Sequence, residues 1–250
     1  MVEILKHRGP ISIRTYWFAD SLQAMGIFRF NNYQQCRIKT GCFGYVRKPF
    51  YTILIDLKSN VNDILAAFDQ STRYEIRRAE KDGTTFGIVE NICDFTNYYN
   101  TFASTKGLPI LATDDLLLYR NNFMATKAVL NENTLVMHAY VRDDVTRRVR
   151  LLHSASLFRN AQNTSMKAEI GRANRYLHYK DIMLFKEQGF ELYDLGGYTK
   201  DADDQSLLNI NKFKEGFGGY VVEESHFYSL PLFILLEARR VWTEKFSQKK

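Results

Sequence analysis

The sequence has few prolines and cysteines and no long apolar run, and each shortage excludes a class of protein. Four prolines in 250 residues, beside 45% hydrophobic residues, leave little room for disordered tracts. The three cysteines, Cys36, Cys42 and Cys93, are an odd number without zinc-type spacing, so we expect reduced thiols and no structural disulfide. The longest apolar run, Leu230 to Leu236, contains Pro231 and is too short to span a bilayer.

The start of the sequence has neither the apolar core nor the small-residue cleavage site of a signal peptide, so we expect a cytoplasmic protein. The net charge of +6 is uneven: residues 1–83 carry 13 Lys and Arg against 8 Asp and Glu, whereas residues 84–250 carry 21 against 20. A basic first third fits an anionic partner such as a nucleotide, tRNA or a membrane surface, or an ordinary need for solubility. The histidines and carboxylates show no metal-ligand spacing, so no metal is expected.

The first third of the chain has a strand pattern followed by two helical patterns. Residues 36–57 are rich in β-branched and aromatic side chains with glycines between them, which predicts strands joined by tight turns. Apolar residues at helical spacing follow in 61–68. A second helix, capped by Ser71 or Thr72, is expected to run to Lys81.

From residue 84 onward, the expected elements alternate in an order that specifies a sheet with crossover helices. The order is β-α-α-β-β-α-β-α-β, followed by an amphipathic C-terminal helix, and it predicts an α/β (α+β) protein. We place the domain boundary after residue 83, between a basic N-terminal half (1–83) and a second domain (84–250). The expected strands are 84–90, 133–144, 147–158, 190–197 and 220–228. The expected helices lie around 95–102, from 113 to 123, at about 172–188 and at about 205–214.

Three stretches resemble the FemAB family of the GNAT acyltransferase superfamily. Residues 174–198 look like the family's helix and strand that end in a D-x-G-G element, and residues 72–83 are similar to its basic N-terminal helix. Residues 211–223 look like its F-K-x-G-F-G-G element, and the element order from residue 84 is that of a GNAT domain. The resemblance implies a GNAT-like mixed sheet flanked by helices, with a truncated N-terminal GNAT-like half. The residues of the two glycine-containing elements are Asp194, Gly196, Gly197, Phe213, Lys214, Gly216, Phe217, Gly218 and Gly219.

The resemblance implies transfer of an acyl group to an amine. Family members that use aminoacyl-tRNA are usually longer, with two complete halves. Shorter proteins with these motifs resemble enzymes that acylate amino sugars for surface polysaccharides. We therefore expect acyl-CoA, such as acetyl-CoA, as donor and an amino sugar, linked to a nucleotide, as acceptor in bacterial cell-envelope polysaccharide synthesis. Transfer of an amino acid from aminoacyl-tRNA to a peptidoglycan precursor is the alternative.

A CoA donor needs a binding site for its pyrophosphate, and GNAT proteins use a glycine-containing loop whose N–H groups meet it at a helix N-terminus. Residues 168–173 stand where that loop belongs, before the helix expected from residue 172. Gly171 and Ala173 match its G-x-A half, Lys167 or Arg172 could supply the positive charge, and Asn174 follows. A plain helix start is the alternative reading of this segment.

The reaction passes through a tetrahedral oxyanion, which needs a cation or preorganised donors. By its place in the F-K-x-G-F-G-G element, Lys214 would stabilise that oxyanion; otherwise it is a solvated lysine beside a glycine turn. The attacking amine must lose a proton, so a base is required. Asp194, at the end of a buried strand, could be that base or could cap the following turn. His153 and His178 are alternative bases, although each is more often a packing residue.

The remaining candidates are contacts to the substrates. Tyr198 could donate a proton to a departing thiolate, while Gly196, Gly197 and Phe217 are expected to line the acceptor site. Arg73 and Arg77 lie on one face of the helix at 72–81, together with Arg78 and Lys81, and could grip a diphosphate. A solvated face, with glutamates interspersed, is the alternative for this basic helix.

Two readings belong to other functional classes. A GNAT-like protein without catalysis could serve as a scaffold in an envelope-polysaccharide assembly. A nucleic-acid-binding module is disfavoured, because the basic residues form no recognition motif and the aromatic residues are not concentrated among them.

Overall fold

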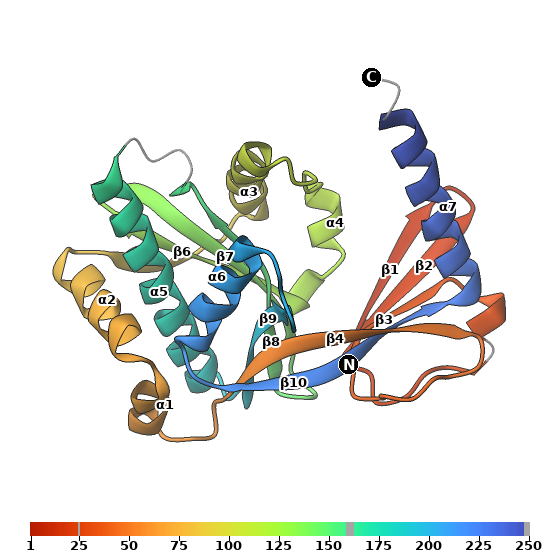
Figure 1. Cartoon of the computed structure of the whole chain (residues 1–250), viewed down its shortest axis with the longest axis horizontal. Coiled ribbons are helices and arrows are strands. Elements are labelled where there is room, and N and C mark those ends of the chain that lie inside the picture. Colours follow the sequence, from red (N-terminus) through yellow and green to blue (C-terminus); the bar gives the residue numbers. More distant parts are fainter. Residues whose placement is uncertain (25, 159–162, 248–250) are drawn as a thin grey trace. The chain divides into compact units, whose positions relative to one another are not determined.

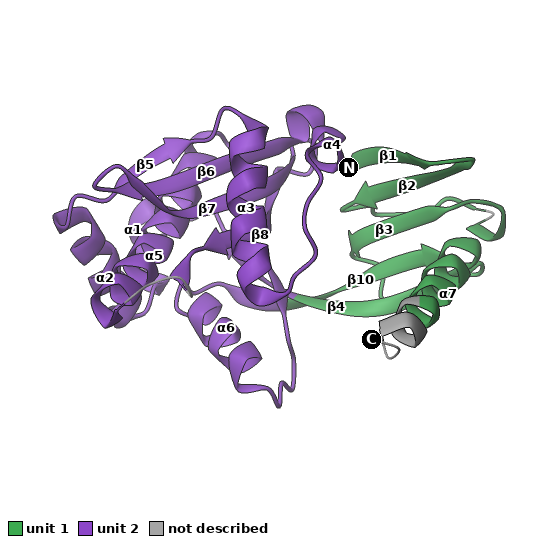
Figure 2. Ribbon diagram, turned by 90° about the horizontal axis from the view of Figure 1, so that it is seen from above, with its two compact units in different colours: residues 1–51, 222–250 green, residues 52–221 purple. Residues whose placement is uncertain are grey.

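The computed structural model describes residues 1–24, 26–158 and 163–247, which form two compact units (Figure 2). Unit 1 consists of Met1–Tyr51 and Val222–Lys250, and unit 2 of Thr52–Val221. This division differs from the boundary expected after residue 83. The last strand and helix belong with the N-terminal residues, because that strand pairs with an N-terminal strand.

Unit 1 contains the strand order β1-β2-β3-β10-β4. Pairing is antiparallel for β1 with β2 and for β10 with β3, but parallel for β2 with β3. Its core includes Tyr16 and Tyr33, whose rings stack with centroids 4.8 Å apart. The elements are β1 (Val2–Arg8), β2 (Ile11–Trp17), η1 (Gly26–Phe28), β3 (Asn31–Cys36), β4 (Tyr45–Asp56), β10 (Tyr220–Ser229) and α7 (Leu230–Ser247); β4 and β10 also contribute residues to unit 2.

Unit 2 contains the strand order β4-β9-β8-β7-β6-β5. Strands β5 to β8 pair antiparallel in sequence order, and β9 joins β8 in parallel. Its strands are β5 (Thr85–Ile88), β6 (Phe123–Leu130), β7 (Asn133–Asp143), β8 (Arg148–Ser156) and β9 (Leu192–Tyr198). Its helices are α1 (Val61–Ala67), α2 (Gln70–Lys81), α3 (Ile92–Lys106), α4 (Thr113–Leu117), η2 (Arg120–Asn122), α5 (Thr164–Glu187) and α6 (Gln205–Glu215).

The helices of unit 2 cover both faces of its sheet, because side chains alternate between the two faces of each strand. On β7, Val136 and Tyr140 pack with the α5 side, where Leu177 lies. Met137 of the same strand packs with Phe95 of α3. The helices α5 and α3 therefore lie on opposite faces, with α2 beside α5 (Figure 1).

The expected class is confirmed: the protein is a mixed α/β protein with a mixed sheet flanked by helices. Four strands were missed. No strand was expected before residue 36, where β1, β2 and nearly all of β3 lie, and none between the helix expected to end at residue 123 and the strand expected from 133, where β6 lies. Its segment FMATKAVL contains only one Val and one Thr as β-branched residues, so its strand propensity is weak. Leu117, expected to be buried, is 52% exposed, and Phe123 begins β6.

Two helix starts also differ from expectation. The cap of α2 is Asp69, whose carboxylate accepts from the Thr72 N–H, rather than Ser71 or Thr72 itself. Helix α5 begins at Thr164, eight residues before the expected start, with Asn163 as its cap. None of the helices in the described part of the chain is both long enough and apolar enough to cross a membrane.

Candidate active site

A cleft begins where two parallel strands of unit 2 separate. Strands β8 and β9 pair over only three residues each, Arg148–Arg150 with Leu192–Asp194. Beyond that ladder, Leu151 of β8 and Leu195 of β9 line a cavity of about 600 Å³. Backbone polar groups that leave a ladder need other partners. An opening in a sheet at this point is therefore a natural place for a ligand.

The cleft is cationic and partly apolar. Four basic side chains line it, one from each of four elements, and among the described residues no Asp or Glu does. Aromatic side chains such as Phe102 and Phe213 supply apolar wall. Such a combination suits a ligand with an apolar part and a phosphate or carboxylate. The basic residues are Lys106 of α3, Arg150 of β8, Arg175 of α5 and Lys214 of α6.

Lys214 is held at the open end of β9. Its ammonium nitrogen Nζ donates to the carbonyl oxygen of Gly197, 2.5 Å away. Burial lowers the pKa of Lys214 to about 8, against the opposing effect of Asp194 and with a further lowering by Arg150. At pH 7 the side chain is therefore charged, but it is poorly solvated, which strengthens its interaction with an anion in the cleft.

The two glycines before Tyr198 make room for this lysine. Gly196 has φ +75°, in the left-handed region that side chains disfavour. A Cβ atom on Gly196 would lie 3.1 Å from the Leu151 carbonyl oxygen and 4.0 Å from Lys214 Nζ. The sequence therefore needs glycine here for both the backbone conformation and the close approach of β8, β9 and the ammonium group.

Arg175 offers unused hydrogen-bond donors to the cleft. Its Nη1 donates to the Gly171 carbonyl oxygen at 3.3 Å, and its guanidinium lies 5.0 Å from the ring centroid of Phe213. Among the described residues, the buried Nε has no hydrogen-bond partner, and no carboxylate lies within ion-pair distance of it. An anion entering the cleft would satisfy these donors.

Asp194 does not have the geometry expected of a base. It is fully buried, does not line the cleft, and its Oδ2 pairs with Arg148 Nη2 at 2.5 Å. Its Oδ1 accepts from the Thr52 hydroxyl and from the Gly196 N–H. Arg148, with Arg150 and the Thr52 bond, keeps the pKa of Asp194 below its usual value despite burial. The carboxylate fixes the turn of β9 instead of facing a substrate.

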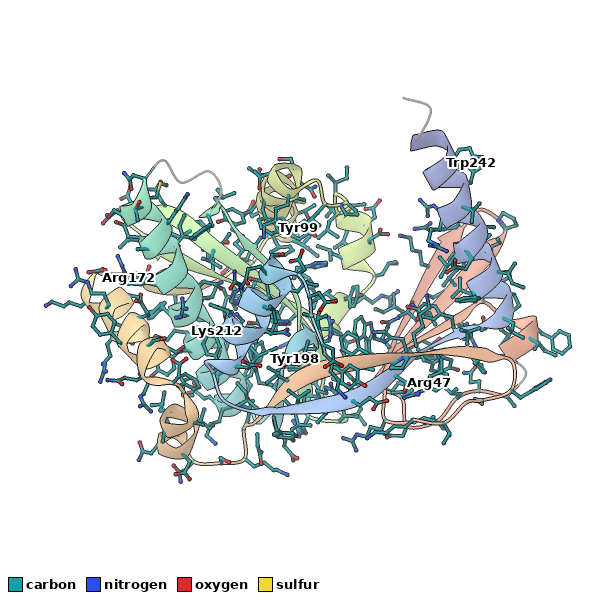
Figure 3. The ribbon with its side chains drawn as sticks, viewed as in Figure 1. Arg47, Tyr99, Arg172, Tyr198, Lys212 and Trp242 are labelled. Carbon is teal, nitrogen blue, oxygen red and sulfur yellow. The ribbon has the colours of Figure 1, made fainter. Side chains whose placement is uncertain are left out.

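The prediction of a pyrophosphate-binding loop at 168–173 is wrong, because those residues form the second and third turns of α5. Their N–H groups point along the helix and bond to carbonyls four residues earlier. Gly171 and Asn174 still line the cleft through their place on the helix face. Arg172 pairs with Asp82 of the α2 terminus (Figure 3), and Ala173 is fully buried in the core.

Three further candidates lie outside the cleft. The Tyr198 hydroxyl donates to Glu215 at 2.8 Å, and this bond raises the pKa of Tyr198, which makes it a weaker acid. His153 packs against Tyr99, with ring centroids 4.9 Å apart, and burial lowers its pKa to about 4. Phe217 is fully buried against Phe68. The expected roles of Tyr198 as acid, His153 as base and Phe217 as substrate contact therefore have no support in the geometry.

The basic face of α2 is also separate from the cleft. Arg73 donates to the Ala66 carbonyl oxygen at 2.9 Å and so closes the end of α1, while Arg77 is exposed. Neither lines the cleft. Of the expected site residues, the structure brings together Gly171, Asn174, His178, Gly196, Gly197 and Lys214.

Sequence reasoning named Gly171, Asn174 and His178 separately, but it missed Arg175 and the face of α5 on which all four lie. Gly171, Asn174, Arg175 and His178 lie at i, i+3, i+4 and i+7, which places them in one stripe on the helix. All four line the cleft. The spacing was visible in the sequence, but an expected helix start at residue 172 hid it. Arg150 carried no comparable signal, because strand alternation alone does not show where a ladder ends.

Comparison with known proteins shows the fold. No protein-family model matches the sequence, and no curated protein matches it. Among solved structures, FemX matches with a TM-score of 0.64 at 14% identity, over 94% of this chain and 86% of FemX. L-PGS from Bacillus licheniformis matches with a TM-score of 0.56 at 13% identity, over 95% of this chain and 84% of the other. The chain has a FemX-like fold, as the resemblance to the FemAB family implied.

Proposed function

We propose that this protein transfers an acyl group from acyl-CoA to the amine of an amino sugar, linked to a nucleotide, in bacterial cell-envelope polysaccharide synthesis. The fold is of an acyltransferase type. The observation that carries the proposal is the cleft at the open end of β8 and β9, where four cations meet an apolar wall without a carboxylate among the described residues. A CoA thioester joins an apolar acyl and pantetheine part to phosphates, and a nucleotide-linked sugar also carries phosphates.

The proposed chemistry assigns one role to Lys214. Attack of a neutral amine on the thioester carbonyl forms a tetrahedral oxyanion, which then expels the thiolate. The Lys214 ammonium, lowered in pKa to about 8 and 2.5 Å from the Gly197 carbonyl oxygen, is a cation held beside the open strand end. Removing one such oxyanion contact typically costs about 10²- to 10³-fold in kcat. Gly196 and Gly197 would allow the acceptor to approach the β9 backbone.

The proposed donor contacts are Arg175 with Arg150 and Lys106. The case for Arg175 is the strongest, since its buried Nε has no hydrogen-bond partner in the part of the chain that the structure describes. Residues 159–162, which precede the start of α5, lie outside the described part of the chain. The donor assignment therefore rests on the basic side chains of the cleft. The proposal involves no metal.

Transfer from aminoacyl-tRNA to a peptidoglycan precursor is the second candidate. The resemblance predicted that family members that use aminoacyl-tRNA are longer than this chain. The match to FemX covers 94% of this chain and 86% of FemX, so the two chains differ little in length, and this favours the second candidate. The two donors predict different responses to salt. Binding of tRNA through many phosphates would weaken steeply with salt, whereas binding of CoA would depend on it much less.

A donor assay separates these candidates. Thermal shift and calorimetry with CoA and acetyl-CoA would measure binding, and thiol release in the presence of UDP- or dTDP-linked amino sugars would measure transfer. We expect a rise in melting temperature with CoA and thiol release that depends on an amino sugar. No shift with either compound, together with transfer from charged tRNA, would overturn the CoA proposal in favour of the second candidate.

Two arginines of α5 provide a matched control. Arg175→Gln removes a cation of the cleft, and we expect about 10- to 100-fold weaker CoA binding, the loss typical of hydrogen bonds to a charged group. Arg172→Gln removes an arginine three residues away that pairs with Asp82 instead. Its CoA affinity should equal that of the wild type. Equal losses in both variants would contradict a donor site in this cleft.

A further inference from the structure

A continuous chain of hydrogen bonds leads from the floor of the cleft into the core of unit 2. The ring of His178 lines the cleft, and its Nδ1 lies 2.9 Å from the Tyr193 hydroxyl. That hydroxyl lies 2.8 Å from the Tyr140 hydroxyl, which donates to Asp181 Oδ2 at 2.6 Å. Both tyrosines and Asp181 are fully buried. The chain therefore connects one group of the cleft wall to one interior carboxylate.

A second branch connects the same carboxylate to the cleft. His138 Nδ1 lies 2.8 Å from Asp181 Oδ2, and its Nε2 lies 2.9 Å from Asn174 Oδ1. Asn174 lines the cleft beside His178. Two imidazoles and two phenols thus gather around Asp181. All the groups of both branches stand on β7, α5 and β9 within unit 2.

This network exceeds what packing needs. Buried polar groups are costly unless each is satisfied, and apolar side chains of similar volume often stabilise a core as well or better. Here Asp181 Oδ1 is buried without a hydrogen-bond partner among the described residues. A carboxylate with one unpartnered oxygen, at the inner end of a chain of hydroxyls, is suited to receive a proton.

The outer end of the chain is also open. His178 Nδ1 is occupied by Tyr193, whereas Nε2 has no hydrogen-bond partner in the described residues. Burial is the largest effect that holds the pKa of His178 well below its usual value, and His138, Lys214 and Arg175 lower it further. The imidazole is therefore neutral at pH 7. It can accept a proton at Nε2 if another proton leaves from Nδ1, because the ring then does not keep a positive charge.

We propose that His178 is the catalytic base of the cleft and that Tyr193, Tyr140 and Asp181 relay the proton it receives into the core. The inference rests on the proposed acyl transfer to an amine. As the amine nitrogen bonds to the acyl carbon, its N–H bond breaks and His178 Nε2 takes the proton.

The remaining proton shifts balance that step. His178 Nδ1–H passes its proton to Tyr193, the Tyr193 O–H passes its own to Tyr140, and the Tyr140 O–H passes its own to the Asp181 carboxylate. Each of the three intermediate groups loses one proton and gains one, so only two groups change charge: the thioester oxygen becomes the oxyanion, and the Asp181 carboxylate becomes neutral. Burial raises the pKa of both tyrosines, which keeps them as phenols between turnovers. Lys214, on the same cleft, faces the oxyanion formed in this step.

The direction of the hydrogen bonds gives a test that does not need turnover. Nitrogen NMR of protein with labelled histidine, together with a His178→Gln sample for assignment, reports which ring nitrogen carries the proton. The relay requires neutral His178 with its proton on Nδ1 at pH 7. A proton on Nε2, or an imidazolium, would overturn the relay, because Nε2 could not then accept from the amine.

Turnover provides the second test. His178→Gln should lower kcat by about 10²- to 10⁴-fold, the usual contribution of a general base, with the KM for the donor nearly unchanged. Tyr193→Phe should lower kcat by a smaller factor and change the proton position on His178. Tyr176→Phe is the matched control, since Tyr176 is buried on α5 and its hydroxyl has no hydrogen bond in the described structure. Its kcat should match the wild type.

The two proposals fail in different ways. Full kcat in His178→Gln, while Lys214→Met is inactive, would overturn the base and leave the acyl transfer standing. Equal losses of kcat in Tyr193→Phe and Tyr176→Phe would reduce the network to a structural role. Lack of transfer from any donor would remove the proposed function and with it the catalytic role of His178, whereas the NMR result would still decide the orientation of the proton chain.

Discussion

The two halves of strand β9 differ in how their polar groups are satisfied. In the first half, Leu192–Asp194 pairs with β8, and the Asp194 carboxylate is bound by Arg148 and Thr52. In the second half the ladder has ended, and Leu195 to Gly197 line a cleft. A single step along the strand, from Asp194 to Leu195, thus separates a closed, structural ion pair from an open site. An acidic residue in a sequence motif therefore need not be the residue that faces the substrate.

The largest expected effect concerns the closed half. Asp194→Asn breaks the buried pair and should lower the free energy of unfolding by about 3–5 kcal/mol, because Arg148 keeps its charge in the core. Chemical denaturation measures this loss. Asp144→Asn, the same change at an exposed carboxylate of the β7–β8 turn, should stay within about 0.5 kcal/mol of the wild type. A similarly small effect at Asp194 would contradict its structural role.

The free energy of unfolding at acidic pH also tests the structural role of Asp194. Since the pKa of Asp194 is lowered on folding, its contribution to stability is present above the unfolded pKa and is lost as the pH falls through the folded one. The wild type should therefore lose stability at acidic pH more steeply than Asp194→Asn.

The next effect concerns the glycines of the open half. Gly196→Ala places a Cβ atom at φ +75° and 3.1 Å from the Leu151 carbonyl oxygen, so we expect a loss of about 1–3 kcal/mol in stability and a loss of activity. Gly189→Ala is the matched control, because Gly189 has φ +81° with nothing within 4 Å. It should lose similar stability and keep activity. Equal activity in Gly196→Ala and Gly189→Ala would show that Gly196 is not part of the active site.

The pH dependence of activity tests the charge of Lys214. Its pKa of about 8 means that kcat should fall as the pH rises through about 8, since the cation is then lost. Stability should move in the opposite direction, because the unfolded lysine binds the proton more tightly and the cost of burying the charge disappears between about 8 and its usual 10.5. In Lys214→Arg, any remaining activity should lack this alkaline fall.

The smallest effect is expected on α2. Arg77 is exposed and does not line the cleft, so Arg77→Gln should change stability by less than about 0.5 kcal/mol and leave the KM of both substrates unchanged. A clear rise in the KM of either substrate would revive the interpretation of this helix as a diphosphate clamp and would place part of the site outside the cleft.

The sequence predicted the strands of unit 2 other than β6 and most of its helices, because periodicity and glycine breakers are local signals. The F-K-x-G-F-G-G element singled out Lys214, which lines the cleft, and its catalytic role stays a prediction. Strand β6 was missed because its Ala and Lys residues do not favour strands. Asp194 and Phe217 were expected in the site, but the structure buries them against Arg148 and Phe68. These partners lie far away along the chain, so the local sequence could not show that the two residues are buried. The network below His178 joins three elements, so no local spacing marks it.

The most direct test of the site is a comparison of two lysines on α6. Lys214 lines the cleft. Lys212, two residues earlier on the same helix and labelled in Figure 3, is exposed and does not line it. Acyl transfer should fall about 10²- to 10³-fold in kcat for Lys214→Met, with the fold intact by circular dichroism, and should be unchanged for Lys212→Met. Full activity in Lys214→Met would contradict an acyltransferase site at the open end of β9 and would favour a scaffold.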